Sequence, residues 1–226
     1  MPAKKSVRKD SPAEPLSDKV EKWKRRIAHY ESGHRKKAHP FSYEKSALLV
    51  VDMQRYFFDK SSHAFLKPAP AILPNVRNIL ESYRKLGLPV IFTRHAYLKG
   101  EDPGIMGTWW RELEEDGDKL AQVVHELEPL PDEPVLRKSR YSAFVGTDLE
   151  KRLRRLGVKR LLITGVMTHL CCESTARDAF MKDFEVFFTI DGTASEDDDL
   201  HVASLMTLTD GFVMPITTEE VLRCIK

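Results

Sequence analysis

The chain has 226 residues, of which 42% are hydrophobic and 31% are charged, and its formal net charge is +2. This length and balance are typical of one large soluble domain with a sizeable core, with or without an appendage. The sequence holds neither an apolar run of about 18 residues nor the apolar segment of a secretion signal, which argues against membrane insertion and against export.

The first 40 residues carry the basic character of the chain. They hold 12 Lys or Arg against 5 Asp or Glu, whereas the other 186 residues hold 24 against 29. A helix over 18–37 is predicted to dock onto the body or a neighbouring subunit through apolar residues at helical spacing: Val20, Trp23, Ile27 and Tyr30. Few aromatic residues accompany the charge, so we expect no nucleic-acid partner. We therefore divide the chain into a basic tail and helix, 1–40, and a main domain, 41–226.

Beyond residue 45, short apolar runs alternate with helical patterns. Runs typical of strands buried on both faces lie at 47–51, 89–93, 160–166 and 185–190, and weaker ones lie at 134–138 and 211–215. Helical patterns lie at about 71–86, 147–156, 171–183, 196–209 and 217–225. This alternation predicts a three-layer α/β/α, Rossmann-like fold with a six-stranded, mostly parallel sheet and an N-terminal helical extension.

Three chemically complementary side chains stand at or just after the ends of predicted strands: Asp52, Lys138 and Cys171. Because ligands bind outside the carboxyl ends of parallel strands, these side chains are expected to share one rim. A free thiol is only about 3% ionised at pH 7, and a nearby ammonium and a helix N-terminus both favour the thiolate. Cys171 would then attack, Asp52 would shuttle the proton and Lys138 would hold the charges in place.

Each of these three residues alone has an ordinary structural explanation. An Asp after a strand is often a helix cap or turn residue, and a Lys at a strand end is usually solvated. A Cys near a helix start is more often a small buried apolar group than a nucleophile. Their shared rim raises the case for catalysis, although it leaves these explanations open.

The two adjacent cysteines differ in helix phase. From Cys172, the residues on the same helix face are Ala176, Ala179 and Phe180, whereas the corresponding positions from Cys171 are polar. Cys172 is therefore predicted to be a packed core thiol and Cys171 to lie near the helix mouth. Neighbouring cysteines rarely form an unstrained disulfide, and with three cysteines in all we expect a reducing, cytoplasmic compartment.

Three segments in order resemble the isochorismatase-like cysteine hydrolase superfamily: LLVVDMQ (48–54), KSRYSAFVGTDLE (138–150) and GVMTHLCCESTARDAF (165–180). The superfamily includes nicotinamidases, N-carbamoylsarcosine amidases, biuret hydrolases and isochorismatases. The resemblance implies a six-stranded parallel sheet between helices and a catalytic triad of Asp52, Lys138 and Cys171. It also implies a cis peptide bond between Val166 and Met167, with the N–H groups of Met167 and Cys171 as the oxyanion hole.

One departure from the resemblance concerns metal. Nicotinamidases of the superfamily bind a metal through an Asp-x-His element with a further His nearby. This chain reads TRHAYL at 93–98, and Thr93 stands where the carboxylate ligand would be. The departure argues against a bound metal and against nicotinamide as substrate, and we expect no cofactor.

A second departure concerns Cys171. True isochorismatases share much of these segments but usually carry glycine at this position, because vinyl-ether hydrolysis needs acid catalysis and no thiol. The thiol therefore favours hydrolysis of a C–N bond in a small amide, carbamoyl or ureide substrate through a covalent intermediate. Two alternatives remain, namely isochorismatase-type ether cleavage with Asp52 as general acid, and a non-catalytic binding protein.

Candidate substrate contacts lie in the loops near the predicted rim: Phe58, Arg94, His95, Trp110, Tyr141 and His169. Two tryptophans beside an arginine in the segment 107–117 suit a planar, anionic or amide-bearing ligand. Most of these side chains are equally well explained as surface or packing groups. Because superfamily members are generally dimers or tetramers, the resemblance also implies a homo-oligomer.

Overall fold

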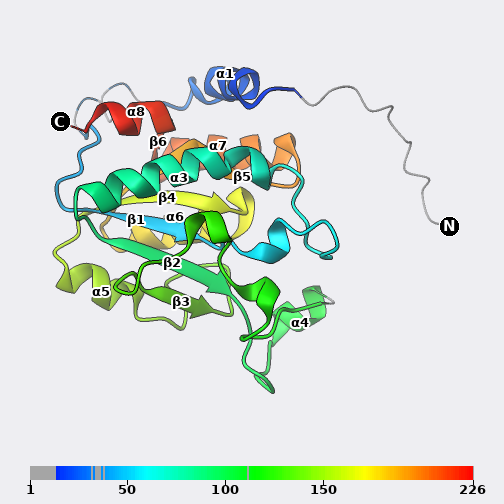
Figure 1. Ribbon diagram of the computed structural model, residues 1–226. Helices are drawn as coiled ribbons and strands as arrows, with labels where there is room; N and C mark the ends of the chain where they lie inside the picture. The colour runs from blue at the N-terminus through cyan, green and yellow to red at the C-terminus, as the bar shows by residue number, and fades with distance from the viewer. Residues whose placement is uncertain (1–13, 32, 34–36, 38, 111, 226) are drawn as a thin grey trace.

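The computed structural model describes residues 14–31, 33, 37, 39–110 and 112–225. Within them, six strands form one parallel sheet in the order β3-β2-β1-β4-β5-β6 (Figure 1). The strands are β1 (Ser46–Val51), β2 (Val90–His95), β3 (Val135–Lys138), β4 (Arg160–Val166), β5 (Glu185–Ala194) and β6 (Met214–Ile216). The predicted α/β fold is confirmed.

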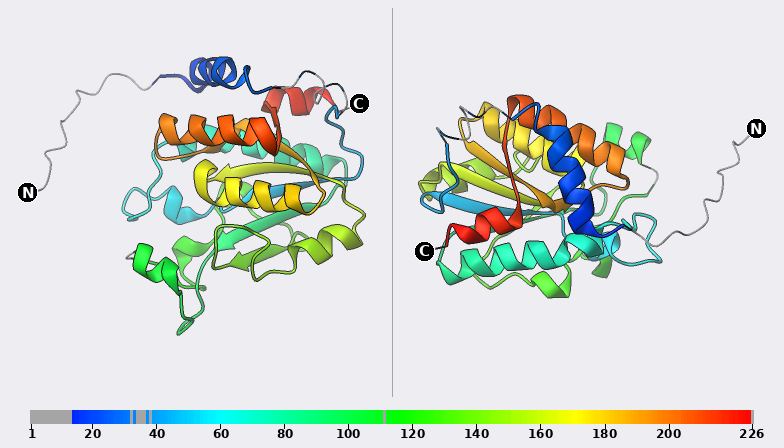
Figure 2. Two further views of the ribbon diagram at one scale, coloured as in Figure 1. Left: turned by 180° about the vertical axis from the view of Figure 1, so that it is seen from behind. Right: turned by 90° about the horizontal axis from the view of Figure 1, so that it is seen from above.

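Helices cover both faces of this sheet (Figure 2). One face packs against α3 (Ala69–Lys85) and α8 (Thr218–Arg223), and the other packs against α5 (Leu149–Arg155), α6 (Glu173–Met181) and α7 (Asp198–Gly211). The long loops contain the short helix α4 (Ile105–Trp109) and the 3-10 turns η1 (Arg55–Phe57), η2 (Lys119–Ala121) and η3 (His125–Leu127). The molecule is therefore a three-layer sandwich with the sheet in the middle.

Strand β1 shows how the sequence divides the core. Leu48 and Val50 pack in the cluster beneath α3, whereas Ala47, Leu49 and Val51 pack in the cluster beneath α5, α6 and α7. Successive side chains of a strand point to opposite faces, so a strand covered on both sides must be apolar at every position. The uninterrupted run ALLVV meets this requirement, and its end brings the chain to Asp52.

The N-terminal helix α1 (Leu16–Ile27) packs against α7 and β5. Its apolar face is buried through Val20, Trp23 and Ile27, as predicted, while Tyr30 lies beyond the helix and is half-buried. The helix is shorter than the predicted 18–37, because residues 28–30 form a turn. Residues 1–13, 32, 34–36 and 38 lie outside the described residues, and the predicted tail and the rest of that helix fall largely there.

Two other boundaries differ from the predictions. β5 runs to Ala194 rather than ending near 190, because the Asp191 carboxylate is satisfied by the Thr218 N–H and hydroxyl and the strand continues past this charge. Helix α7 extends to Gly211, so β6 begins only at Met214. Neither shift changes the strand order or the rim on which the candidate site lies.

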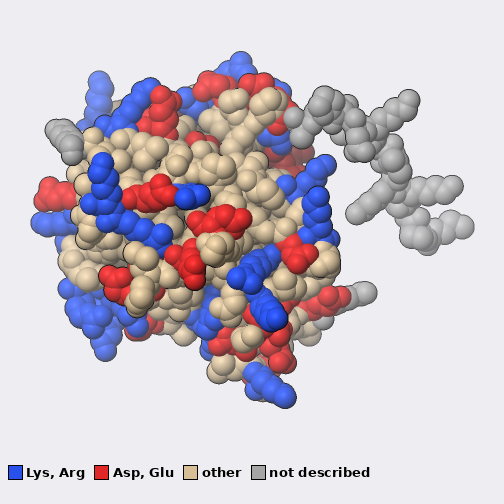
Figure 3. Space-filling model, in the orientation of Figure 1, with Lys and Arg blue, Asp and Glu red and all other residues tan. Residues whose placement is uncertain are grey.

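Among the described residues, no helix combines the length and the apolar character needed to cross a membrane. On the face drawn in Figure 3, acidic and basic side chains are interspersed.

Candidate active site

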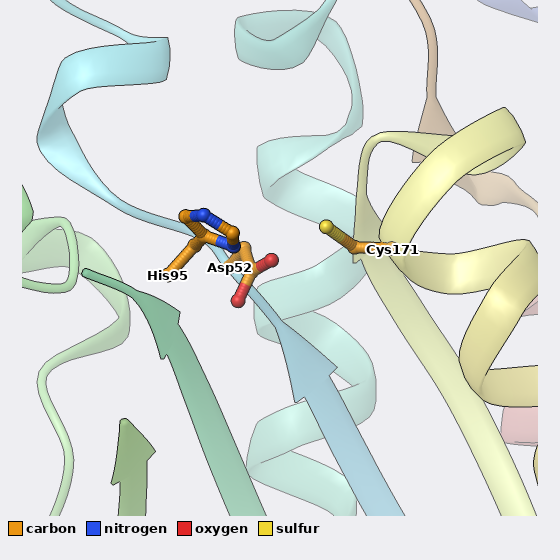
Figure 4. A group of neighbouring side chains, drawn as sticks. All are labelled: Asp52, His95 and Cys171. Carbon is orange, nitrogen blue, oxygen red and sulfur yellow. The ribbon is translucent and has the colours of Figure 1, made fainter. Parts of the chain in front are cut away.

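Asp52, Lys138 and Cys171 converge at the carboxyl ends of the central strands. Asp52 directly follows β1, Lys138 is the last residue of β3, and Cys171 lies in a π-helical turn, η4 (Thr168–Cys172), between β4 and α6. Figure 4 shows Asp52 and Cys171 pointing toward each other, with the ring of His95 beside them. The predicted juxtaposition is thus present in the fold, although Cys171 precedes α6 in a wider turn rather than in a regular first helical turn.

The Lys138 ammonium lies at the centre of this group. Its Nζ is 2.7 Å from Oδ2 of Asp52 and donates hydrogen bonds to Cys171 Sγ at 3.2 Å and to the Arg140 carbonyl at 3.1 Å. The Lys138 and Asp52 side chains are fully buried, so the ion pair is held in a medium where charge interactions are strong. Cys171 is 7% exposed and opens onto the cavity described below.

Thr93 on β2 fixes the orientation of the Asp52 carboxylate. Its hydroxyl donates a 2.6 Å hydrogen bond to Oδ1 of Asp52 and accepts one of 3.1 Å from the Asp52 backbone N–H. Gln54 fixes the neighbouring strand end, because its side-chain oxygen accepts from the His95 N–H at 2.7 Å. Neither residue was predicted as part of the site, although both fall within quoted segments, Gln54 in LLVVDMQ and Thr93 in TRHAYL.

Burial dominates the electrostatics of the nucleophile candidate. It raises the pKa of the Cys171 thiol to about 12, an effect that Lys138 opposes and Asp52 reinforces. For Lys138, burial alone would lower the pKa, but the charge of the adjacent Asp52 carboxylate is the largest opposing effect and the pKa is held above its usual value. The resting site therefore contains a neutral thiol beside the Lys138–Asp52 ion pair, because burial outweighs the effect of the ammonium that was expected to favour the thiolate.

Asp52, His95 and Cys171 offer ligand atoms within 4.8 Å of one another, which is close enough to consider a metal ion. The ammonium of Lys138, however, lies among them, 2.7 Å from Asp52 Oδ2, 3.2 Å from Cys171 Sγ and 3.4 Å from Nδ1 of His95. A divalent cation at this place would be repelled by the buried positive charge of Lys138. Burial and the Lys138 charge also lower the pKa of His95 to about 4, so its ring is neutral near pH 7. These three residues do not fit a metal ion.

The segment GVMT brings β4 into η4. The Val166–Met167 peptide bond is cis, at the position that the resemblance implies. Gly165 adopts a φ of +118°, and a Cβ there would clash with the carbonyl oxygen of Val51. Glycine thus lets β4 approach the end of β1, and this close approach places η4 beside Asp52.

A cavity of about 340 Å³ opens above Cys171. Four of the predicted contact residues line it: His95, Trp110, Tyr141 and His169. Trp110 and Tyr141 are joined by a 2.8 Å hydrogen bond from the indole N–H to the phenol oxygen. Met167 and Leu170 contribute from η4 and the residue before it. The cavity suits a small ligand bound over the thiol.

Two predicted contact residues, Phe58 and Arg94, are absent from the cavity lining. Phe57 in the 3-10 turn η1 lines the cavity, whereas Phe58 is partly buried against the cluster beneath α3 and does not line it. Arg94 forms an ion pair with Asp116 at 2.8 Å. The sequence around Arg94, Phe57 and Phe58 has no pattern that predicts the direction of these side chains.

Several lining residues were not predicted: Tyr56, Phe57, His63, Ala64, Phe65, Leu66, Met106, Glu112, Leu113, Glu114 and Glu196. Most of them come from the loops after β1 and β2. These loops lack the periodicity from which a strand or helix face can be inferred.

The isochorismatase domain model matches residues 46–220. Nicotinamidase 3 of Arabidopsis thaliana is 42% identical over 182 residues, covering 79% of this chain and 87% of that protein. Isochorismatase of Bacillus subtilis (strain 168) is 33% identical, covering 71% of this chain and 52% of that protein. Among solved structures, a cysteine hydrolase of Pseudomonas syringae pv. phaseolicola 1448A superposes with a TM-score of 0.79 at 28% identity, covering 83% of this chain and 95% of that one. With its parallel α/β sandwich and the match over residues 46–220, this chain belongs to the isochorismatase family of hydrolases.

Proposed function

We propose that this protein hydrolyses the C–N bond of a small amide, carbamoyl or ureide substrate, with Cys171 as the nucleophile. One observation carries the proposal: the Cys171 thiol faces the cavity while touching a buried Lys138–Asp52 ion pair. A nucleophile, a proton acceptor and a fixed positive charge therefore meet at one end of a space that fits a small molecule.

In the first half of the reaction, Asp52 takes the thiol proton as Sγ attacks the substrate carbonyl carbon. The oxygen becomes an anion, which the N–H groups of Met167 and Cys171 stabilise. Asp52 then gives the proton to the leaving nitrogen as the C–N bond breaks, which leaves a thioester on Cys171. In the second half, Asp52 takes a proton from water, the water oxygen attacks the thioester carbon, and the thiol leaves with the proton restored.

The high pKa of Cys171 suits this sequence of steps. Since the buried thiol stays protonated until a substrate is present, proton transfer to Asp52 accompanies attack rather than preceding it. Lys138 contributes by keeping its charge 3.2 Å from the sulfur, where it stabilises the anionic sulfur that forms during attack and departure. Thr93 holds one carboxylate oxygen of Asp52, which leaves the other oriented by Lys138.

The comparisons favour amide chemistry over ether cleavage, because the relative named a nicotinamidase is 42% identical and the one named an isochorismatase is 33% identical. The nicotinamidase likeness is at odds with the expectation drawn from Thr93, so nicotinamide belongs among the substrates to be tested. Ether cleavage by Asp52 alone stays the alternative, since it would use the same carboxylate and leave the thiol idle.

The test is an ammonia-release screen of carboxamides, including nicotinamide, and of carbamoyl compounds and ureides, with isochorismate assayed in parallel for ether cleavage. We expect release from at least one C–N substrate, abolished in Cys171→Ala and retained in Cys224→Ala, whose thiol is exposed and remote. Activity on isochorismate that survives Cys171→Ala but not Asp52→Ala would establish the ether alternative instead.

A further inference from the structure

The cavity above Cys171 has an acidic lining. Three carboxylates contribute to it, from Glu112, Glu114 and Glu196, and no lysine or arginine does so among the residues that the structure describes. Even a protonated His63 in the same lining would leave the sum of these charges negative. A ligand in this space therefore meets a negative potential at the end away from the Lys138 ammonium.

Three of the basic groups around the site are held in ion pairs, while Arg140, which donates to the Ser139 carbonyl, does not line the cavity. Arg94 lies 2.8 Å from Asp116, Arg137 lies 2.8 Å from Glu101, and Lys138 lies 2.7 Å from Asp52. The two cavity histidines other than His63 also carry little positive charge near pH 7, because burial lowers the pKa of both His95 and His169. The described lining of the cavity thus offers no lysine or arginine that would bind a substrate carboxylate.

Glu114 is the most enclosed of the three carboxylates. Its side chain is 13% exposed, against 69% for Glu112, and one of its oxygens lies 3.9 Å from Nδ1 of His63. His63 in turn stacks on the ring of Tyr56, with centroids 6.5 Å apart. Tyr56 and His63 both line the cavity, so the Glu114 carboxylate is held against a fixed aromatic wall rather than free in solvent. A charge in that position is screened by solvent less than the charge of the exposed Glu112.

We propose that this cavity admits uncharged or positively charged amides and repels anionic ones, and that Glu114 is the residue that sets this selection. That the ligand is an amide rests on the proposed function, whereas the selection by charge rests only on the residues that line the cavity. A substrate carboxylate placed toward Glu114 would face a like charge, with no lysine or arginine in the described lining to offset it. A neutral ring or a positively charged group would meet aromatic faces and a carboxylate acceptor.

Charge selection is measurable without turnover by using Cys171 as the reporter. Two methanethiosulfonate reagents of similar size, the cationic trimethylammonioethyl and the anionic sulfonatoethyl forms, each convert a thiol to a mixed disulfide. Peptide mass spectrometry gives the rate at which each reagent modifies Cys171 and the exposed Cys224. Cys224 serves as the internal reference. We expect the cation-to-anion rate ratio at Cys171 to exceed that at Cys224 by at least about tenfold.

Two variants assign the effect to its source. Glu114→Gln is expected to reduce the ratio at Cys171 by about threefold or more, whereas Glu115→Gln, an exposed neighbour outside the cavity lining, should leave it unchanged. Equal ratios at Cys171 and Cys224, or a ratio insensitive to Glu114→Gln, would overturn the proposal. Arg111 lies outside the described residues and is tested separately. Faster reaction of Cys171 with the anionic reagent, lost in Arg111→Gln, would also overturn the proposal.

The outcome is separable from that of the proposed function. If the ammonia screen finds no C–N substrate while the reagent ratio behaves as expected, the hydrolytic proposal fails and charge selection stands. If benzamide and 3-(aminomethyl)benzamide are hydrolysed no better than 3-carboxybenzamide, amide hydrolysis stands and charge selection fails.

Discussion

The hydroxyl of Thr93 and the carboxylate of Asp52 are joined by a 2.6 Å hydrogen bond, and the same hydroxyl accepts from the Asp52 backbone N–H. This pair links the ends of β2 and β1, and it gives Thr93 a role that differs from its interpretation as a missing metal ligand. The carboxylate is thereby held on one side by a neutral donor and on the other by the Lys138 ammonium.

Thr93→Val should lower kcat by about ten- to a hundredfold, because a hydrogen bond to a charged group is worth about 1.5–3 kcal/mol. The substitution keeps the shape of the side chain but frees the Asp52 carboxylate to rotate. Steady-state kinetics on the substrate found in the screen would measure the effect. Thr189→Val is the matched control, since it removes a buried hydroxyl that donates to the Ile163 carbonyl instead. An equal loss of kcat in both variants would contradict an orienting role.

Asp52→Asn should increase the reactivity of the Cys171 thiol toward an alkylating reagent while it lowers the rate of hydrolysis. The Asp52 charge raises the pKa of the thiol, so removing that charge lowers the pKa and should increase alkylation by iodoacetamide at pH 8. Hydrolysis should fall by at least about a thousandfold, because the proton acceptor is gone. Alkylation is measured in a Cys224→Ser background. Slower alkylation together with lost hydrolysis would point to a collapsed site rather than a missing base.

Trp23→Ala should destabilise the protein by about 3–5 kcal/mol, the usual range for truncating a buried aromatic residue. Trp23 lies on α1, outside the family match, and its ring is 4.2 Å from that of His201 on α7. Urea denaturation would give the change in the free energy of unfolding. Arg25→Ala on the exposed side of the same helix is the control. A change below about 0.5 kcal/mol for Trp23→Ala would mean that α1 is not docked in solution.

His201 should make the fold less stable in mild acid. Burial lowers its pKa to about 4, from an ordinary value near 6.5, so above pH 6.5 the ring is neutral in both states and contributes nothing. As the pH falls from 6.5 to 4, His201 is protonated in the unfolded chain but not in the folded protein. The free energy of unfolding therefore falls by about 3 kcal/mol over this range. His201→Asn should flatten this part of the pH profile of unfolding free energy. A profile unchanged by the substitution would show that His201 titrates normally.

The sheet could be predicted because its evidence is local. Strands such as 47–51 and 160–166 are apolar at every position, which is what burial on both faces requires, and glycines such as Gly87 and Gly157 end the helices between them. Asp52, Lys138 and Cys171 could then be placed on one rim, since parallel strands end at the same edge.

Other features depend on how loops and helix ends are turned in space. Cys172 is fully buried, as helix phase predicted, but Phe180 on the same predicted stripe is 45% exposed, because the buried face of α6 runs through Thr175, Ala176 and Ala179. The choice of Phe57 over Phe58 follows from the 3-10 turn η1, which has no sequence periodicity. The homo-oligomeric state and the cytoplasmic compartment stay predictions.

The proposed hydrolysis requires that Cys171 forms a covalent bond to the acyl part of the substrate. The most direct measurement is intact-protein and peptide mass spectrometry after acid quenching during turnover of a slowly hydrolysed amide. We predict a mass increase equal to the acyl group, located on the peptide that contains Cys171 and absent in Cys171→Ala. Continued turnover with no adduct, combined with full activity in Cys171→Ala, would contradict the mechanism.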